Sequence, residues 1–256
     1  MDVLITGSTG MVGKSVLQEC INDKRVKNIY LINRLPVNLK SPKISEFIIS
    51  DFLKVGEVKK IYLINRIPIN LKSAKICEFI LTDFLKVGEL KKNIENCDAC
   101  FHCMGITSFG QSSEYYYRVT YEMTKAITDL VYSINSNSIM TYVSGEGTST
   151  NENSKISWAN VKGKTENYIL NKGLKDAYMI RLGLLVPGNG IRPKTKLYYL
   201  FYTLMRPIYP LMKLFPTITT SSKLGLAMIN SFYYPVSEKF LDNRKINRLS
   251  KMHLTK

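Results

Sequence analysis

The sequence lacks an uninterrupted run of about twenty apolar residues, which is the length that a membrane-spanning helix needs. Its most apolar stretch, residues 197–215, is broken by Arg206, Lys213 and two prolines. No charged leader with an apolar core precedes the first apolar segment at residue 3, so no secretory signal is expected. The five cysteines are odd in number, which without an export signal indicates reduced thiols. These absences predict a cytoplasmic protein.

Acidic side chains are scarce, since 20 Asp and Glu residues stand against 36 Lys and Arg residues and leave a net charge of +16. Such an excess suits nucleic acid, an anionic membrane surface or a phosphate-rich ligand. The lysines are scattered rather than gathered in one block, and no basic recognition motif is present. A solvated surface is therefore the favoured explanation, and no nucleic-acid partner is expected.

Three of the cysteines, Cys97, Cys100 and Cys103, have a spacing that resembles metal ligation. The segment around them is an apolar strand, in which residues three apart point to opposite faces. Strand geometry would therefore separate the sulfur atoms, and no metal site is predicted.

What the sequence does have is a nucleotide-binding start. The apolar run from Val3 to Ile5 predicts a strand, glycines follow at 7, 10 and 13, and an amphipathic helix begins after them. In such a unit the first glycine permits a tight turn, the second lets the backbone approach a pyrophosphate, and the third lets the helix pack on the strand. The helix N-terminus then faces the phosphates. The residues expected to contact a dinucleotide here are Gly7, Ser8, Thr9, Gly10, Met11 and Val12.

A tandem duplication follows, because residues 26–57 and 58–89 align without a gap and are identical at 25 of 32 positions. Two copies are too few for a solenoid, which needs about three units. Each copy predicts a strand ending in Arg, a polar loop and a second strand ending in Asp. A dinucleotide-binding sheet needs one such pair, so the surplus strands should form an edge extension or a protruding hairpin.

The residue that ends the second strand lies beside the adenosine ribose, where an arginine accommodates a 2′-phosphate. The candidates are Arg34 and Arg66, so NADP is predicted rather than NAD. Asp51 or Asp83 would lie near the adenine. Chain order favours Arg34 for the phosphate and Asp83 for the adenine. A later strand around Cys100 brings Met104 and Gly105 to the cofactor.

Further along the chain, residues 139–144 predict a strand that ends in Ser144, and a helix then carries Trp158 and Lys162 four residues apart on one side. With the glycine triplet, these segments resemble the short-chain dehydrogenase/reductase superfamily. YVSGEGTS, SWANVKGKTEN and GIRPKTKLY are similar to an atypical branch of NAD(P)-binding epimerase/dehydratase-like proteins, of the NmrA-like and Tat-interacting-protein-like groups. The likeness covers nearly the whole chain apart from one repeat copy.

The resemblance implies that Ser144 holds the substrate oxygen and that Lys162 binds the ribose, while Trp158 occupies the position of the catalytic Tyr. An indole N–H donates a hydrogen bond but transfers no proton near neutral pH. General acid/base catalysis contributes about a hundredfold to ten-thousandfold, so carbonyl reduction needs another proton donor. Tyr121, Tyr142, His102 and water are the open alternatives. Packing over the cofactor pocket is favoured for Trp158.

The sequence thus predicts one domain over 1–256, a Rossmann-type doubly wound α/β fold with a mainly parallel sheet and a small C-terminal cap after about residue 190. A strand is expected over 177–186, a helix capped by Ser221 or Ser222, and after Phe240 a short strand or turn with a frayed end. Residues 197–215 suit a substrate lid, contact with a second copy in a homo-oligomer, or a membrane surface. Two functions remain: an NADP(H)-dependent oxidoreductase or epimerase on an unknown small substrate, or a non-catalytic cofactor sensor with a protein partner.

Overall fold

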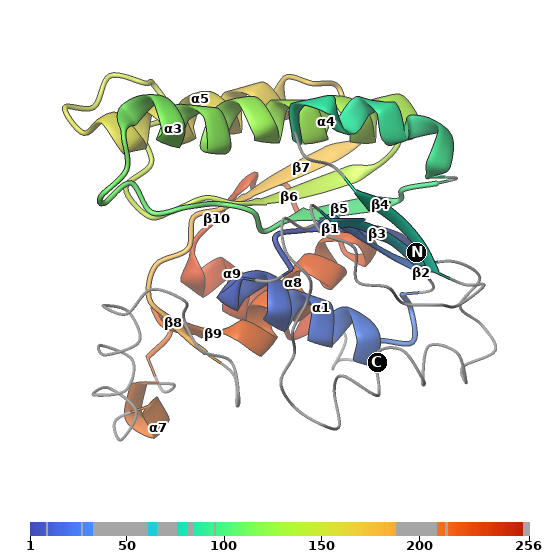
Figure 1. The fold of residues 1–256 in the computed structure, drawn as a ribbon. Helices are drawn as coiled ribbons and strands as arrows, with labels where there is room; N and C mark the ends of the chain where they lie inside the picture. Colours follow the sequence, from blue (N-terminus) through green and yellow to red (C-terminus); the bar gives the residue numbers. More distant parts are fainter. Residues whose placement is uncertain are drawn as a thin grey trace.

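The computed structural model describes residues 1–8, 10–26, 28–32, 61–65, 76–80, 84–94, 96–187, 209–212 and 215–252. An eight-stranded sheet lies between two layers of helices (Figure 1). The strand order is β10-β7-β6-β5-β1-β2-β3-β4, and each pairing between described strands is parallel. The predicted α/β class with a mainly parallel sheet is confirmed. The strands are β1 Asp2–Thr6, β2 Asn28–Ile32, β3 Ile61–Asn65, β4 Ile76–Ile80, β5 Ala99–His102, β6 Ile139–Val143, β7 Asp176–Ile180 and β10 Phe240–Leu241.

The helices cover both faces of the sheet, as connections between parallel strands require (Figure 1). The upper layer in the figure contains α3 Ser113–Tyr117, the π-helical turn η2 Arg118–Glu122, α4 Met123–Ile134 and α5 Ser157–Leu170, and the 3₁₀ helix η1 Phe84–Asn93 packs against α4. The lower layer contains α1 Met11–Asn22, α8 Ser221–Tyr233 and α9 Asn243–Leu249.

Two apolar clusters fill the space between the sheet and these layers. Alternate residues of β1 serve opposite clusters, because Val3 and Ile5 pack with α1 and α8 while Leu4 packs with α4. The cysteines divide in the same way: Cys100 belongs to the upper cluster, and Cys103 packs against the lower one. The expected separation of these two sulfur atoms by strand geometry is confirmed.

The duplicated segment widens one edge of the sheet. β2 from the first copy pairs with β1, whereas β3 and β4 both come from the second copy. β2 and β3 carry the same IYLI sequence and pair in register, with Tyr30 opposite Tyr62 and Ile32 opposite Ile64. The surplus strands were expected to form either an edge extension or a protruding hairpin. The described strands form the edge extension.

The last third of the chain departs from the expected pattern in three places. β7 ends at Ile180 rather than continuing to residue 186, because the Leu182 N–H turns back onto the Ile180 carbonyl and the Ser144 N–H takes the same oxygen. Thr220, not Ser221 or Ser222, caps α8 and accepts a hydrogen bond from the Lys223 N–H. The short strand expected after Phe240 is β10, but the chain then forms α9 instead of fraying at once, because the Asp242 carboxylate caps that helix.

The residues expected to build the C-terminal cap divide between two positions. The short strands β8 Leu185–Val186 and β9 Thr219–Thr220 form a separate two-stranded sheet, near the short helix α7 Tyr209–Met212 in Figure 1. By contrast, β10 joins the main sheet and α8 packs along α1. Most of the expected lid, 197–215, lies outside the described residues. Among those that are described, no helix combines the length and apolar character needed to cross a membrane.

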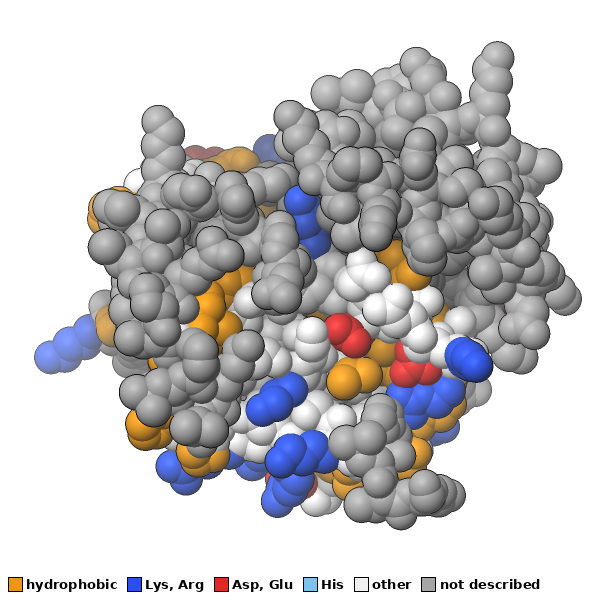
Figure 2. Space-filling view, turned by 90° about the horizontal axis from the view of Figure 1, so that it is seen from below, with side chains coloured by type: hydrophobic (Ala, Val, Ile, Leu, Met, Phe, Trp, Pro, Cys, Tyr) orange, Lys and Arg blue, Asp and Glu red, His pale blue; other side chains and the backbone are white. Residues whose placement is uncertain are grey.

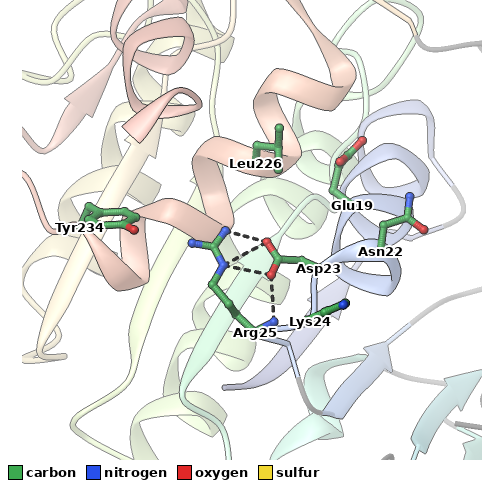
Figure 3. A pocket seen from close by; sticks show the side chains of 7 residues that line it. All are labelled: Glu19, Asn22, Asp23, Lys24, Arg25, Leu226 and Tyr234. Carbon is green, nitrogen blue, oxygen red and sulfur yellow. Dashed lines mark hydrogen bonds and ion pairs between the residues drawn. The ribbon is translucent and has the colours of Figure 1, made fainter. Parts of the chain in front are cut away.

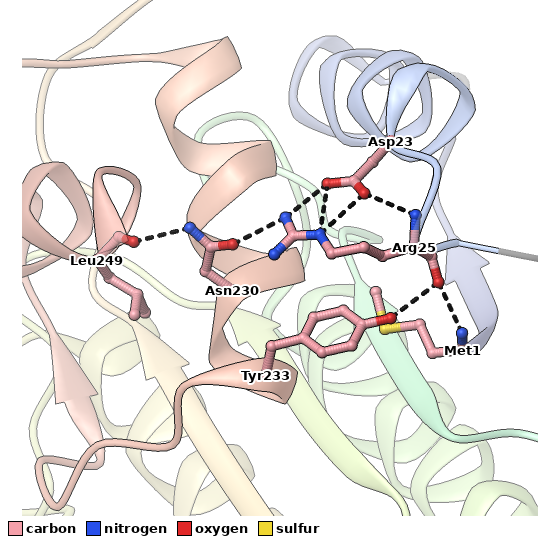
Figure 4. Close-up of polar contacts among 6 residues, drawn as sticks. All are labelled: Met1, Asp23, Arg25, Asn230, Tyr233 and Leu249. Atoms are coloured by element: carbon pink, nitrogen blue, oxygen red, sulfur yellow. Dashed lines mark hydrogen bonds and ion pairs between the residues drawn. The ribbon is translucent and has the colours of Figure 1, made fainter. Parts of the chain in front are cut away.

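One polar cluster fastens the lower helices to the end of α1 (Figure 4). The Arg25 guanidinium pairs with the Asp23 carboxylate and also donates to the Asn230 side-chain oxygen on α8. The Tyr233 hydroxyl and the Met1 nitrogen both donate to the Arg25 carbonyl. The Asn230 amide in turn donates to the Leu249 carbonyl of α9. The cluster therefore holds the C-terminal ends of α8 and α9 at the amino edge of the sheet, opposite the glycine loop.

Lys and Arg side chains are spread over the lower face rather than collected in one patch (Figure 2). On the described part of that face they alternate with apolar and neutral side chains. This distribution agrees with a solvated surface.

Candidate functional site

The candidate site lies at the carboxyl edge of the sheet, where β1, β5 and β6 end side by side. Loops that leave this edge of a doubly wound sheet form the usual ligand crevice. The glycine loop after β1 and the Ser144 loop after β6 are two strands apart, about 10 Å at ordinary strand spacing. The segment containing Met104 and Gly105 lies between them.

The glycine loop has the close packing that its spacing predicted. Gly7 adopts a φ of +71°, and a Cβ atom there would lie 2.6 Å from the Met104 nitrogen. A Cβ atom on Gly13 would lie 2.2 Å from the Gly7 carbonyl oxygen. Glycine is therefore required at both places, one for the turn beside β5 and the other for seating α1 on the strand.

Gly10 is different, because the nearest atom to a Cβ there would be the Gly7 oxygen at 3.3 Å. Gly10 is the N-cap of α1 and has no side chain to bond the first-turn amides. Those amides, together with the positive end of the helix dipole, form an anion-binding surface. Met11 and Val12 begin the helix, and Ser8 is buried beneath the loop. Thr9, Arg34, Arg66, Asp51 and Asp83 lie outside the described residues.

β5 contributes a neutral, buried histidine. The two ring nitrogens of His102 contact the hydroxyl groups of Thr6 at 2.8 Å and Thr124 at 3.0 Å. Burial, and to a lesser extent the charge of Lys162, lower the pKa of this imidazole to about 3. His102 thus ties β5 to β1 and α4, and near neutral pH it is not the imidazolium that a general acid would need. Beyond it, Met104 is buried against Gly7 and Gly105 is exposed.

Ser144, Trp158 and Lys162 come together around the loop that follows β6. The Lys162 Cε atom would lie 4.0 Å from a Cβ on Gly145, and the Trp158 ring would lie 3.5 Å from a Cβ on Gly147. The first two turns of α5 therefore lie directly over the loop that Ser144 begins.

The Ser144 hydroxyl lies 3.0 Å from that of Thr148. Thr148 donates its own proton to the Gly145 carbonyl, so the Ser144 proton goes to Thr148. With its proton directed to Thr148, the Ser144 oxygen can only accept hydrogen bonds from the crevice. A ligand that reorients the two hydroxyl groups would change this. No pattern in the sequence indicates Thr148, because its role depends on how the 145–148 turn closes.

Lys162 is half-buried, and its ammonium lies 5.3 Å from the centre of the Tyr142 ring. Burial lowers the pKa of Lys162 to about 8, and the charge of Glu166 partly opposes that effect. No ion pair or hydrogen bond to the Lys162 ammonium occurs within the described residues. A cation held in this way is available to a ligand hydroxyl or phosphate.

Glu166 is fully buried one helical turn after Lys162. Its two oxygens accept hydrogen bonds from Arg181 at 2.6 and 3.2 Å. Arg181 also donates to the Thr150 hydroxyl and stacks on Phe240 at 4.3 Å. This ion pair joins α5 to the end of β7 beneath the site. The four-residue spacing from Lys162 was its only signal in the sequence.

None of the side chains considered as replacement proton donors is suited to that role. Tyr142 is buried, and burial raises its pKa far above the ordinary range. Tyr121 lies on the outer face of the helices, where it stacks on Tyr117 and contacts the Lys164 ammonium beside a cavity of about 490 Å³. Lys164 follows Lys162 by two residues and so projects to the opposite side of α5.

A further cavity, of about 390 Å³, lies at the amino edge of the sheet between the end of α1 and α8 (Figure 3). Two of its charged groups, Asp23 and Arg25, neutralise each other. A helix of twelve residues, about 18 Å in length, separates this cavity from the glycine loop. It is therefore not part of the candidate site.

Comparison with known proteins agrees with this fold. A family model described as Male sterility protein, an NAD-binding family, matches residues 5–181, which is more than half of the chain. Among proteins with curated annotation, none matches the sequence.

Several solved structures share the fold. The thiolation-reductase di-domain of an archaeal non-ribosomal peptide synthetase is 16% identical, with a TM-score of 0.58 and coverage of 99% of this chain and 80% of that one. ADP-L-glycero-D-manno-heptose-6-epimerase from Helicobacter pylori is 13% identical, with a TM-score of 0.61 and coverage of 100% and 83%. UDP-glucuronic acid 4-epimerase from Bacillus cereus, in complex with NAD, is 14% identical, with a TM-score of 0.56 and coverage of 93% and 74%. At these identities the likeness shows the fold alone.

Proposed function

This chain belongs to the NAD-binding family described as Male sterility protein, within the short-chain dehydrogenase/reductase group that its sequence resembles, and we propose that it binds NADP(H) as an oxidoreductase or epimerase on a small carbonyl substrate. The observation that carries the proposal is the glycine loop. Gly7 and Gly13 fit only as glycines, while Gly10 leaves the α1 amides open to a diphosphate.

The residues present fit a dinucleotide. The first turn of α1 would hold the pyrophosphate, Lys162 would bind the nicotinamide ribose, and Ser144 would contact the substrate oxygen. When bound, the dinucleotide supplies or accepts the hydride. Met104 and Gly105 would border the cofactor between these groups, and Trp158 would close the pocket above the Ser144 loop. Burial and, to a lesser extent, the nearby Lys162 charge lower the pKa of His102 and keep it neutral, so it serves to hold the strand ends in register.

The preference for NADP over NAD rests on Arg34, which follows β2 by two residues in the sequence, and β2 is the strand beside β1. Asp83 is proposed for the adenine edge. Arg34→Ala should weaken NADPH binding more than NADH binding, whereas Arg66→Ala should leave both unchanged. Loss of NADPH affinity only in the Arg66 variant would reverse the assignment of the two copies.

The direct test substitutes Gly10 with Ala. A Cβ there would meet only one atom within 3.4 Å, so the folded state should lose no more than about 1 kcal/mol. Because the methyl group would project over the open amides, NADPH affinity measured by calorimetry should fall at least about tenfold. Gly88→Ala is the control, since nothing lies within 4 Å of a Cβ there. Equal NADPH affinity in the Gly10 variant and in the unsubstituted protein would refute the proposal.

A second candidate function is a cofactor sensor without turnover. Two observations favour it: Trp158 stands at the proton-donor position, and the Ser144 proton is directed to Thr148. Single-turnover oxidation of bound NADPH across a panel of carbonyl compounds separates the two. Oxidation of NADPH would support the enzyme, while binding with no oxidation by any compound would support the sensor.

A further inference from the structure

A polar cavity of about 230 Å³ opens at the carboxyl edge of the sheet, next to the Ser144 loop. Glu146 from the loop after β6 lines one side, and Arg181 and Gly183 after β7 line another. The N-terminus of α9 completes the wall with Asn243 and Arg244. Pockets for whole drug-sized ligands have roughly 300–1,000 Å³, so this cavity suits a fragment of about monosaccharide size.

Most polar groups in the wall are already occupied. Asn243 is buried, accepts a hydrogen bond from the Gly183 N–H, and donates to the carbonyls of Leu184 and Thr217. The Asp242 carboxylate caps α9, and Arg181 is paired with Glu166. These contacts fix the shape of the cavity. They also use most of the hydrogen-bonding capacity of Asn243, Asp242 and Arg181, so little of it remains for a ligand.

Glu146 and Arg244 are the exceptions. Both are exposed, and neither side chain makes a hydrogen bond or ion pair with another described residue, although the Glu146 backbone N–H donates to the Leu182 carbonyl. The two have opposite charges and line the same cavity without pairing. Glu146 also lies only two residues after Ser144, so its cavity adjoins the point where the substrate oxygen is proposed to bind.

Gly183 leaves room for the Glu146 carboxylate beside it. A Cβ atom on Gly183 would lie 2.6 Å from the Glu146 Oε2 atom and 3.2 Å from the Asn243 amide nitrogen. Any other residue at 183 would displace the end of the Glu146 side chain. The absence of a side chain at Gly183 therefore leaves room for the carboxylate at this place in the cavity wall.

We propose that this cavity binds the polar part of the substrate, and that the substrate is a hydroxylated anion of the sugar-acid or sugar-phosphate class. Glu146 accepts hydrogen bonds from sugar hydroxyl groups, and Arg244 pairs with the carboxylate or phosphate in a bidentate manner. Because the wall is polar, an unsubstituted alkyl chain gains little there. The inference rests on the proposed function and names the substrate class for that site.

Binding can be measured without turnover, by ligand-detected NMR titration of the whole chain. D-Glucuronate should bind more tightly than hexanoate, which lacks hydroxyl groups, and than D-glucose, which lacks the anion. Comparison with glucose 6-phosphate decides between carboxylate and phosphate. Glu146→Gln should weaken glucuronate about tenfold and leave hexanoate unchanged. Arg244→Gln should weaken both acids about tenfold and leave glucose unchanged.

Two further variants serve as controls for this interpretation. Gly183→Ala should reproduce the Glu146→Gln result, because it moves the carboxylate without removing it. Arg248→Gln alters an exposed arginine of the same helix, paired with Glu238, and should change no affinity. If neither glucuronate nor glucose 6-phosphate binds, or if both charge variants bind like the unsubstituted protein, the cavity is not a sugar-anion site. Retained NADPH binding in the same samples would then show that only this inference has failed.

Discussion

Lys162 carries a charge that its surroundings oppose. Its pKa in the folded protein is about 8, below its ordinary value of 10.5, because burial disfavours the ammonium. The unfolded chain therefore holds this proton more tightly than the folded one. Stability should rise with pH between about 8 and 10.5, and below pH 8 the full cost of the charge is present.

Lys162→Met should consequently stabilise the protein at pH 7 by up to about 3 kcal/mol, and the gain should disappear near pH 10.5. Urea unfolding at both pH values measures the effect. Lys164→Met is a matched control on the opposite side of α5, where a hydrogen bond with Tyr117 raises the pKa of the lysine. That control should bring no gain at pH 7. A destabilised Lys162 variant at pH 7 would mean that the charge is favoured in the fold.

At the level of single residues, the sequence indicated the residues of the candidate site, but it did not indicate the buried ion pair beneath them. The glycine spacing and the pair Ser144 and Lys162 followed from motifs, and the structure brings the last two to one loop. Glu166 was missed because a carboxylate is expected at the surface unless it has a partner. Its partner, Arg181, lies on another element, and no local pattern connects the two.

At the level of secondary structure, the Arg181–Glu166 pair is what joins α5 to the end of β7. Arg181→Met leaves a fully buried carboxylate without its cation and should cost about 3–5 kcal/mol in urea unfolding. Adding Glu166→Gln should recover a large part of that loss, because the double variant contains no unpaired buried charge. Arg248→Gln, which breaks an exposed pair, should cost less than about 1 kcal/mol. A double variant no more stable than Arg181→Met would place the cost in lost packing on Phe240.

The elements themselves were largely predictable where hydrophobic periodicity was strong. β1, β5 and β6 lie where apolar runs placed them, and the segment from η2 to α4 buries Val119, Met123, Ile127 and Leu130 at helical spacing. The incorrect predictions concern the end of a strand and the end of the chain. The termination of β7 at Ile180 depends on a backbone oxygen shared with Ser144, and α9 is a short polar helix recognisable only with its Asp242 cap.

For the whole molecule, the duplication predicts that one copy is dispensable. Deleting residues 35–66 joins the first strand of copy one to the second strand of copy two and restores a single repeat unit. β4 should then pair with β2 in the way that it now pairs with β3, since the two partner strands share the IYLI sequence. The shortened chain should show cooperative thermal unfolding and NADPH affinity within about tenfold of the full chain. A chain that does not fold would show that the extra strand is required.

The sequence predicted the doubly wound class of the sheet, but it did not predict the number of strands. Alternating strands and helices after a glycine loop define a doubly wound sheet. Two nearly identical segments, however, carry nearly identical propensities, so propensity alone could not decide which of them lies beside β1. Chain order and the pairing of β1 with β2 decide it in favour of the first copy.

The pairing of β2 with β3 also has a consequence between molecules. Identical strands that stack in parallel and in register present each other with the same row of amide and carbonyl partners, which is how fibril-forming segments recognise their own kind. An IYLI segment from a neighbouring chain would match β2 as well as β3 does. The duplication that widens this sheet therefore also provides a template on which two copies of the protein can exchange strands.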